Sequence, residues 1–403
     1  MHQLKIPAVF MRGGTSNAIV FKEQDLPEDR SLWPEIFLAA HGSPDPFGRQ
    51  LNGMGGGISS LSKICVIGPP SRDDADVDYT FAQVGVRNTA VGFSGNCGNM
   101  SAAMGPFSVD EGFVAVDGKT ARIRIHNTNT QKIIVSQFDM DDGLAGVDGD
   151  YVMPGVADPG NQVRLDFLEP GGAGTGKLLP SGNVLDILDI PGLGKVEASI
   201  VDAANPAVFV EASAVGLKGT ELPADIDAMS DVMAKLEAIR RHAGVLVGMA
   251  ESVDAMADKP AVISPGIVAP AQDAPILTGE VIPEAAGDLV CRIVSSGNVH
   301  RALPGTRSIC TAVASRIAGT VVHRVTRPVD DPTADIRIIQ PSGVIVLAAD
   351  VVESDGEKDG GFFAKSATIY RTQRRLFEGF VCVPAAKVPN YVRYTQPRAS
   401  AAE

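Results

Sequence analysis

The sequence predicts a mixed α+β fold of two pseudo-symmetric domains, each a curved, mostly antiparallel sheet wrapped around a central helix of small residues. Short segments of alternating polarity recur along the chain, as half-buried antiparallel strands require. Two segments, at 92–108 (GFSGNCGNMSAAMGPFS) and 300–321 (HRALPGTRSICTAVASRIAGTV), each lead from a polar turn into a helix of Ala, Ser, Gly and Thr. A sheet can close around such short side chains, so we expect two related domains whose helix N-termini face one shared site.

The individual elements follow from the same patterns. One capped helix is predicted within 25–42, and a long amphipathic helix is predicted over 226–243. Strands are predicted at 6–11, 18–22, 64–68, 77–86, 121–128, 132–140, 162–168, 184–190, 195–203 and 206–212. We predict a first domain at 1–182, a second at 183–385 and a tail at 386–403. Whether the last strand of the second domain returns to the first domain is left open.

The composition excludes several classes of protein. The 403 residues are 44% hydrophobic and 21% charged, which is typical of a globular protein. The 35 basic and 48 acidic residues give a net charge of −13 without a basic stripe, so no nucleic-acid partner is expected. No apolar run reaches the ~20 residues of a membrane span. The five cysteines are scattered, and we expect a reducing, cytoplasmic location.

Cys97 is the cysteine whose surroundings suggest chemistry. It stands in SGNCGN, directly before the first small-residue helix. A helix N-terminus stabilises a thiolate, and Asn and Gly neighbours are too polar for a core segment. Cys65, Cys291 and Cys382 alternate within apolar segments and are interpreted as core residues, and Cys310 is also expected in the core.

Two further segments offer ligand-binding groups. The glycine-rich stretch 52–66 (NGMGGGISSLSKICV) frees the backbone for a close approach to a ligand, and Lys63 enters a strand there. A lysine at such a border either extends to water or, in a dry cleft, acts as a general base. MRGGTSN at 11–17 places Arg12, Thr15 and Ser16 beside a flexible turn, which suits a carboxylate or a surface hairpin equally.

Two apparent motifs are rejected. GGAGTGKL at 171–178 lacks the Ser or Thr that a phosphate loop needs after its lysine. The six histidines show no metal-ligand spacing, so no metal site is expected, and His300 is the one histidine of interest because it precedes the second small-residue helix.

These motifs together resemble the PrpF family over roughly residues 5–385. The resemblance is carried by MRGGTS, GSPDP at 42–46, GMGG with SxxSK at 53–63, SGNCGN, GKLLPSGN at 176–183 and GLKGTELP at 216–223. The family includes isomerases of methylaconitate, methylitaconate and aconitate and 4-oxalomesaconate tautomerase. It implies the fold of diaminopimelate epimerase, with Lys63 and Cys97 as catalytic residues. Pro304 stands where that epimerase has a second cysteine, so a two-cysteine mechanism does not fit.

The chemistry of such an isomerase matches these residue types. A proton leaves an allylic carbon, the negative charge spreads over a dienolate, and a proton returns elsewhere. Lys63 is assigned as the base and Cys97 as the proton donor, with the reverse order left open. No cofactor or metal is required. The expected substrate-binding residues are Arg12, Thr15, Ser16, Gly55, Gly56, Ser60, Asn96, Gly98, Asn99, Gly305 and Thr306.

Some alternatives stay open at this point. The substrate is expected to be a small anionic di- or tricarboxylic acid, but the sequence does not name it. Asn17 and Asn52 replace the lysine and aspartate that are usual in the family, which bears on the same question. A non-catalytic protein that binds such acids and a hydrolase that uses Cys97 as nucleophile are the two rival functions, and a homodimer is one option for the assembly.

Overall fold

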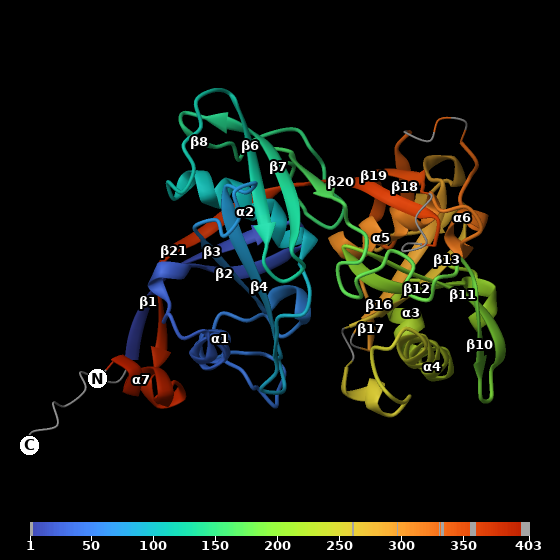
Figure 1. Cartoon of the computed structure of the whole chain (residues 1–403), viewed down its shortest axis with the longest axis horizontal. Coiled ribbons are helices and arrows are strands. Elements are labelled where there is room, and N and C mark those ends of the chain that lie inside the picture. Colours follow the sequence, from blue (N-terminus) through green and yellow to red (C-terminus); the bar gives the residue numbers. More distant parts are fainter. Residues whose placement is uncertain are drawn as a thin grey trace, which may run out of the picture.

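The computed structural model describes residues 3–259, 262–295, 297–329, 331, 334–354 and 360–395. The chain forms two lobes of similar construction, each a curved sheet around one buried helix (Figure 1). The fold predicted from the sequence is therefore confirmed. No helix in these residues is long and apolar enough to cross a membrane.

The first lobe wraps its sheet around α2 (Gly98–Asp110). Most neighbouring strands are antiparallel, but β2 pairs with β3, and β4 with β6, in parallel. The strands of this lobe are β1 (Gln3–Gly13), β2 (Ser16–Lys22), β3 (Lys63–Gly68), β4 (Val77–Val84), β5 (Val91–Gly92), β6 (Thr120–Asn127), β7 (Lys132–Asp141), β8 (Leu144–Ala145) and β9 (Val163–Leu168). On the other side of this sheet, α1 (Trp33–His41) packs in a separate apolar cluster with Ile64 and Val66 of β3.

The second lobe repeats the plan around α5 (Gly305–Ser315), of which every residue is buried. Its strands are β10 (Asp186–Ile190), β11 (Gly194–Ala203), β12 (Asn205–Glu211), β13 (Ser264–Pro270), β16 (Leu289–Ser295), β17 (Asn298–Val299), β18 (Ile336–Gln340) and β19 (Gly343–Glu353), with a separate pair β14 (Ala274–Pro275) and β15 (Val281–Ile282). The other helices of this lobe are α3 (Pro223–Ala228), α4 (Ser230–Leu246) and α6 (Val321–Val325).

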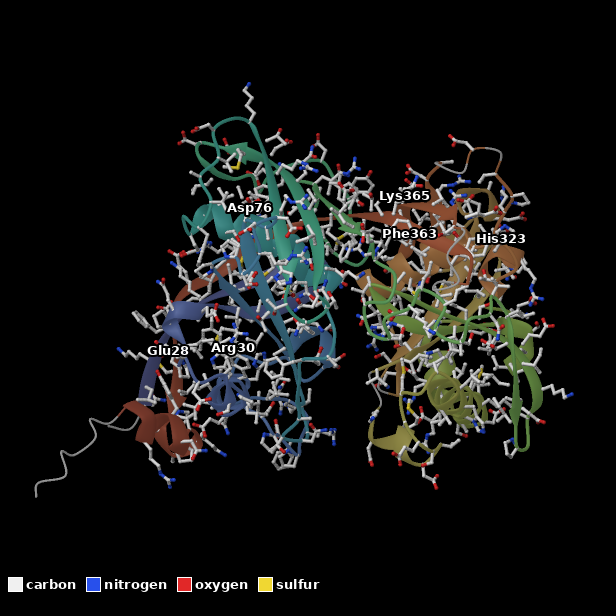
Figure 2. All side chains as sticks on the ribbon, in the orientation of Figure 1. Glu28, Arg30, Asp76, His323, Phe363 and Lys365 are labelled. Carbon is white, nitrogen blue, oxygen red and sulfur yellow. The ribbon has the colours of Figure 1, made fainter. Side chains whose placement is uncertain are left out.

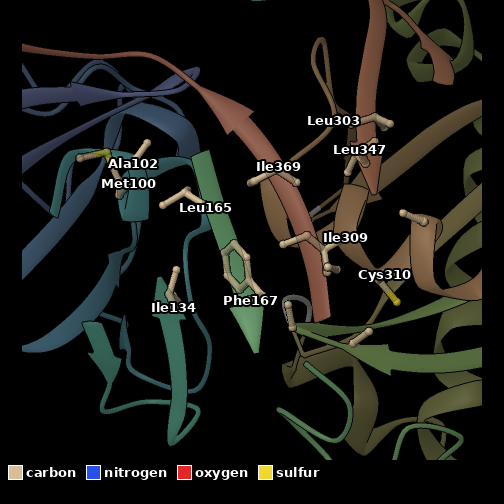
Figure 3. Packing of buried hydrophobic residues seen from close by; sticks show 14 of the residues in the cluster. Met100, Ala102, Ile134, Leu165, Phe167, Leu303, Ile309, Cys310, Leu347 and Ile369 are labelled. Atoms are coloured by element: carbon tan, nitrogen blue, oxygen red, sulfur yellow. The ribbon is translucent and has the colours of Figure 1, made fainter. Parts of the chain in front are cut away.

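Two long strands join the lobes. β20 (Phe362–Arg371) pairs with β19 of the second lobe and, from Ser366 onward, with β9 of the first. β21 (Gln373–Pro384) then pairs with β1 along its whole length. Figure 3 shows the resulting continuous core, with Leu165 of β9 and Ile369 of β20 between the residues of α2 and those of α5. The lobes are thus linked by shared strands, and the exact domain boundary stays a prediction.

Small residues allow the close packing of the central helix. A Cβ on Gly105 of α2 would lie 2.5 Å from the Ser136 hydroxyl oxygen of β7, closer than real Cβ atoms come. Pro106 lies inside α2 as well, yet the residues from Gly98 to Val109 are all buried. Tertiary burial therefore outweighs the low helix propensity of this segment.

The structure corrects two details. The helix predicted over 226–243 is interrupted at Met229, whose ψ of 83° leaves the helical region, so that α3 and α4 are separate. Cys382 is exposed and is not a core residue, because the alternation of β21 turns Val381 and Val383 inward and Cys382 outward. Within the predicted tail, α7 (Pro389–Thr395) contacts Glu35 of α1 through the Asn390 amide at 3.1 Å, and residues 396–403 lie outside the described residues.

Candidate active site

The N-termini of α2 and α5 meet at two glycines. A Cβ on Gly98 would lie 2.8 Å from the backbone nitrogen of Thr306, and a Cβ on Gly305 would lie 2.9 Å from the carbonyl carbon of Gly98. Any side chain at either position would therefore push the two helices apart. Cys97 caps α2 and Pro304 caps α5, so the two residues occupy equivalent places in the two lobes.

This meeting point favours an anion. The first backbone N–H groups of a helix have no partner within the helix, and the helix dipole adds about half a positive charge at that end. Neither helix is capped by a hydrogen bond from its N-cap side chain, and neither carries an acidic residue in its first turn. Two positive helix ends therefore face each other, and a carboxylate at this junction would neutralise both.

Lys63 lies on the face of β3 that packs against α2. Lys63 and Cys65 are two residues apart in the strand and share that face, where Cys65 belongs to the core cluster around α2. Burial raises the pKa of the Cys65 thiol, and the charges of Cys97 and Lys63 both act on it. Cys97 packs against the same core cluster, so Lys63 and Cys97 both border the core around α2, and their role as a catalytic pair stays a prediction.

The Lys63 ammonium group is held by neutral groups. Its side chain is buried, and its Nζ donates to the Gln83 amide oxygen at 2.6 Å and lies 5.1 Å from the centre of the Phe81 ring. The Gln83 amide nitrogen donates to the carbonyl oxygens of Ser59 and Ser62, which fixes the amide oxygen toward Lys63. Among the described residues, Lys63 forms no ion pair with a carboxylate, so its charge is not already neutralised there.

Two histidines, one in each lobe, have strongly lowered pKa values. Burial lowers the pKa of His41 to about 4, and the charge of Lys63 adds to that effect. Burial likewise lowers the pKa of His300 to about 4, with further contributions from Lys63 and Arg307. His300 follows β17 of the second lobe.

Asn99 joins the first turn of α2 to the turn between β1 and β2. Its amide nitrogen donates to the hydroxyl oxygens of Thr15 at 2.9 Å and Ser16 at 3.4 Å, while its amide oxygen accepts a hydrogen bond from Arg371 Nε at 3.0 Å. A Cβ on Gly14, where φ is +53°, would lie 2.6 Å from that same oxygen. The motifs MRGGTSN and SGNCGN therefore form one polar cluster.

Other predicted binding residues contact protein groups. Arg12 donates through Nη1 to the carbonyl oxygens of Gly14 at 3.0 Å and Thr372 at 3.1 Å. The glycine-rich loop folds over the buried Gln50 side chain: a Cβ on Gly55 would lie 2.3 Å from its amide, and a Cβ on Gly56 would lie 2.7 Å from Leu61. These glycines are thus required by internal packing, and substrate contacts of Arg12, Gly55, Gly56 and Ser60 stay predictions.

The sequence analysis missed Asn205, which connects the turn before α2 to the first turn of α5. Its amide nitrogen donates to the carbonyl oxygen of Asn96 at 3.1 Å and to the Thr306 hydroxyl at 2.9 Å. Asn205 lies at the start of β12, and the preceding Ala204 has a φ of +63°. The Ala-Asn-Pro sequence signals a turn, but its contact with both lobes depends on the tertiary fold.

The segment that resembled a phosphate loop binds a carboxylate of the protein itself. Asp202 accepts hydrogen bonds from the backbone nitrogens of Gly174 and Thr175 and from the Thr175 hydroxyl, at 2.7–2.8 Å. Burial raises the pKa of Asp202, while these hydrogen bonds and the charge of Arg307 lower it. The anion-binding groups of the 171–178 segment are therefore already occupied by Asp202.

Three of the described histidines are bonded to groups other than Cys97. His41 and His242 contact backbone carbonyl oxygens, and His126 contacts Asp78 and Ser71, so none of them binds Cys97. His323, on α6, lies on the outer side of the second lobe in Figure 2. Within these residues no group of three or more His, Cys, Asp or Glu side chains could hold a metal ion.

The fold is similar to the fold of known racemases and epimerases. A hydroxyproline epimerase from Agrobacterium vitis shares the fold with a TM-score of 0.56 at 10% identity, over 94% of this chain and 93% of that one. The family model described as "PrpF protein" matches residues 3–384, so the chain belongs to the PrpF family.

Individual relatives are similar over nearly their whole length. The chain is 41% identical to 3-methylitaconate isomerase of Eubacterium barkeri, over 96% of this chain and 99% of the relative. It is 33% identical to 2-methyl-aconitate isomerase of Shewanella oneidensis, over 95% and 98%. A crystal structure of methylitaconate-delta-isomerase matches with a TM-score of 0.80 at 39% identity, covering 100% of both chains. The chain is therefore an isomerase.

Proposed function

We propose that this protein isomerises small unsaturated di- or tricarboxylic acids by transfer of an allylic proton, without a cofactor. The observation that carries the proposal is the meeting of two helix N-termini at Gly98 and Gly305, with Cys97 at the N-cap of the first. The relatives named for methylitaconate and 2-methylaconitate support the substrate class.

The proposed reaction assigns one role to each group. A substrate carboxylate binds the backbone N–H groups at Gly98–Asn99 and Gly305–Thr306, which also stabilise the dienolate charge. Lys63, as the free amine, takes the proton from the allylic carbon, and the electron pair spreads over the double bond and the carboxylate. Cys97 returns a proton at the other end of that system. The resulting ammonium and thiolate exchange a proton to restore the starting state.

Gln83 supports Lys63 in this cycle. Its amide oxygen faces Nζ in a fixed orientation, and a neutral partner allows the lysine to lose and regain its proton without breaking an ion pair. The buried position also removes water that would compete for the proton. A hydrolase that uses Cys97 is less well supported, because no described histidine side chain hydrogen-bonds to that thiol.

Proton NMR in D₂O tests the proposal. Methylitaconate, cis-aconitate, trans-aconitate, 2-methylaconitate and 4-oxalomesaconate are each incubated with wild-type protein, Lys63→Ala and Cys97→Ser. At least one acid is expected to isomerise and take up deuterium, and each substitution is expected to slow this by about 10²–10⁴-fold.

Two control variants keep the result specific. Lys195→Ala changes an exposed lysine of the second lobe, and Cys382→Ser changes an exposed cysteine of the first lobe. Both variants should leave the rate unchanged. If no acid exchanges a proton with wild-type protein, the proposed function is wrong. If exchange persists in both site variants, the acid–base assignment is wrong although the activity stands.

A further inference from the structure

Gln50 is an unusual residue in the glycine-rich loop between α1 and β3. Its backbone has a φ of +56°, in the left-handed region that residues other than glycine rarely adopt. Its side chain is 0% exposed, although glutamine is mostly found at protein surfaces. Such a backbone conformation costs about 1–3 kcal/mol and persists only where the surrounding structure fixes it. The strain at Gln50 therefore indicates that its side chain supplies something that a glycine could not.

The Gln50 side chain is the centre around which the loop folds. Its amide nitrogen donates to the Ser43 hydroxyl oxygen at 2.8 Å. Its amide oxygen accepts hydrogen bonds from the Gly57 backbone nitrogen at 2.9 Å and from the Ser62 hydroxyl at 2.7 Å. These bonds connect the beginning, the middle and the end of the loop, so residues 43–62 are held together by one buried amide.

The end of this loop fixes the side chain of Gln83 on β4. The Gln83 amide nitrogen donates to the carbonyl oxygens of Ser59 at 3.0 Å and of Ser62 at 2.9 Å. The Ser62 carbonyl oxygen also accepts from the Val84 backbone nitrogen at 3.0 Å, which ties the end of the loop to the same strand. A carbonyl oxygen accepts and an amide nitrogen donates, so only one of the two orientations of the Gln83 amide satisfies these contacts.

This orientation determines which atom of Gln83 faces Lys63. The amide oxygen accepts a hydrogen bond from Nζ at 2.6 Å. Rotation of the amide by 180° would present its nitrogen instead. That nitrogen would oppose the ammonium form of Lys63, and it would donate to the lone pair of the free amine, which the proposed proton transfer requires. A continuous series of hydrogen bonds therefore runs from Gln50 through Ser62 and Gln83 to Lys63.

We propose that Gln50 is a positioning residue for Lys63: it holds the loop carbonyl oxygens that orient the Gln83 amide, and so keeps the amine of Lys63 available for proton transfer. The assignment rests on the proposed function and deepens it, because Gln50 acts through Gln83 and not through contact with the substrate. Gly55 lets the loop close on Gln50, since any side chain there would overlap the Gln50 amide. The glycine-rich motif thus serves Lys63 whether or not it also contacts the substrate.

A double-mutant cycle tests this assignment. The variants are Gln50→Leu, Gln83→Leu and the two combined, and the assay is the isomerisation of the acid that reacts with wild-type protein. We expect Gln50→Leu to lower kcat by about 10-fold and to leave KM within about 2-fold of wild type, because proton transfer is impaired and substrate binding is not. In the Gln83→Leu background, Gln50→Leu should change kcat by less than about 2-fold, because the group through which it acts is already absent.

Two further variants separate positioning from stability. Gln50→Gly removes the side chain but suits the positive φ, so it should lower kcat as Gln50→Leu does while losing less stability. Gln340 of β18 is a matched control, since it is 2% exposed, accepts from the Leu303 backbone nitrogen and donates to the Ser342 hydroxyl oxygen. Gln340→Leu should lower stability, and any effect on kcat should be equal with and without Gln83.

The outcomes distinguish this assignment from the proposed function. If Gln50→Leu lowers kcat equally with and without Gln83, Gln50 acts through the stability of the loop and the assignment is wrong. Wild-type kcat in both Gln50 variants also overturns it. If Gln50→Leu does not fold, Gln50→Gly takes its place in the same cycle. A wild-type protein that isomerises none of the acids overturns the proposed function itself, and the role of Gln50 with it.

Discussion

The turn before α2 and the turn before α5 are structurally equivalent but chemically different. Each places a helix N-terminus at the junction of the lobes, and each begins its helix with a glycine that nearly touches the other. Cys97 stands at the N-cap of the first helix and Pro304 at that of the second. Lys63, moreover, belongs to the first lobe.

This difference separates binding from proton transfer. Backbone N–H groups bind a carboxylate whatever side chains are present, so we expect both lobes to share that role. Proton transfer needs titratable side chains, and the first lobe supplies both that we assign. An internal repeat can therefore retain a symmetric anion site while its catalytic residues become confined to one half. The following predictions test that division.

Loss of the glycine contact should have the largest effect. Gly98→Ala introduces a Cβ 2.8 Å from the Thr306 nitrogen, and the backbone cannot give way as a flexible side chain would. We expect kcat/KM to fall by about 10²-fold because the two helix N-termini separate, and the melting temperature to fall as well. Gly305→Ala should lower kcat/KM and the melting temperature to a similar extent. Gly92→Ala, where the added Cβ meets no atom within 4 Å, is the control, and a fully active Gly98→Ala variant would contradict the shared anion site.

The neutral histidines should make stability depend on pH. The pKa of His41 is about 4 in the folded protein and about 6.5 in the unfolded chain. Between these values the unfolded chain binds a proton that the folded protein does not, so the free energy of unfolding decreases as pH falls from 6.5 toward 4. The contribution of His41 is at most about 3 kcal/mol.

Chemical denaturation at several pH values measures this effect. The His41→Gln variant should show a shallower decline than wild type between pH 6.5 and 4, whereas His242→Gln on α4 should not. An unchanged slope in His41→Gln would show that another group controls the acid sensitivity.

Asn205 should act as a positioning residue. Asn205→Ala removes the hydrogen bonds to Asn96 and Thr306 that connect the two turns. We expect kcat to fall by about 10-fold with a smaller change in KM, and stability to fall by about 1–2 kcal/mol because buried groups lose their partner. Steady-state kinetics and denaturation measure both. A loss of stability with unchanged kcat would limit Asn205 to a structural role, and Asn390→Ala is a surface control.

Pro304 should show the smallest effect. Pro304→Ala keeps the backbone N–H groups of α5 and removes no titratable group, so kcat/KM should stay within about 3-fold of wild type. Cys97→Ala at the equivalent place should instead lower it by at least about 10²-fold. Equal losses at the two positions would show that both N-caps act through packing and that the lobes do not divide the chemistry.

Local patterns located the longer elements of the first half of the chain. Alternating polarity located ten of the strands up to β12 but missed the short β5 and β8, and the small-residue segments located α2 and α5. The break at Met229 was not predictable, because its apolar side chain fits the periodicity of the flanking helices and only the backbone departs from it. Cys382 was misassigned for a related reason: alternation shows that two faces exist but does not say which of them an edge residue presents.

The sequence by itself determined the family and the fold, and it predicts Lys63 and Cys97 as the catalytic pair because they stand in short motifs whose chemistry is local. It could not reveal Asn205 or Arg371, which lie far from those motifs along the chain and reach them only through the packing of β12 and β20. Tertiary structure alone decided that two helix N-termini meet and that a buried guanidinium group lies beside them. The physical reason is that burial and charge pairing depend on what surrounds a residue in space, and its sequence neighbours do not specify that.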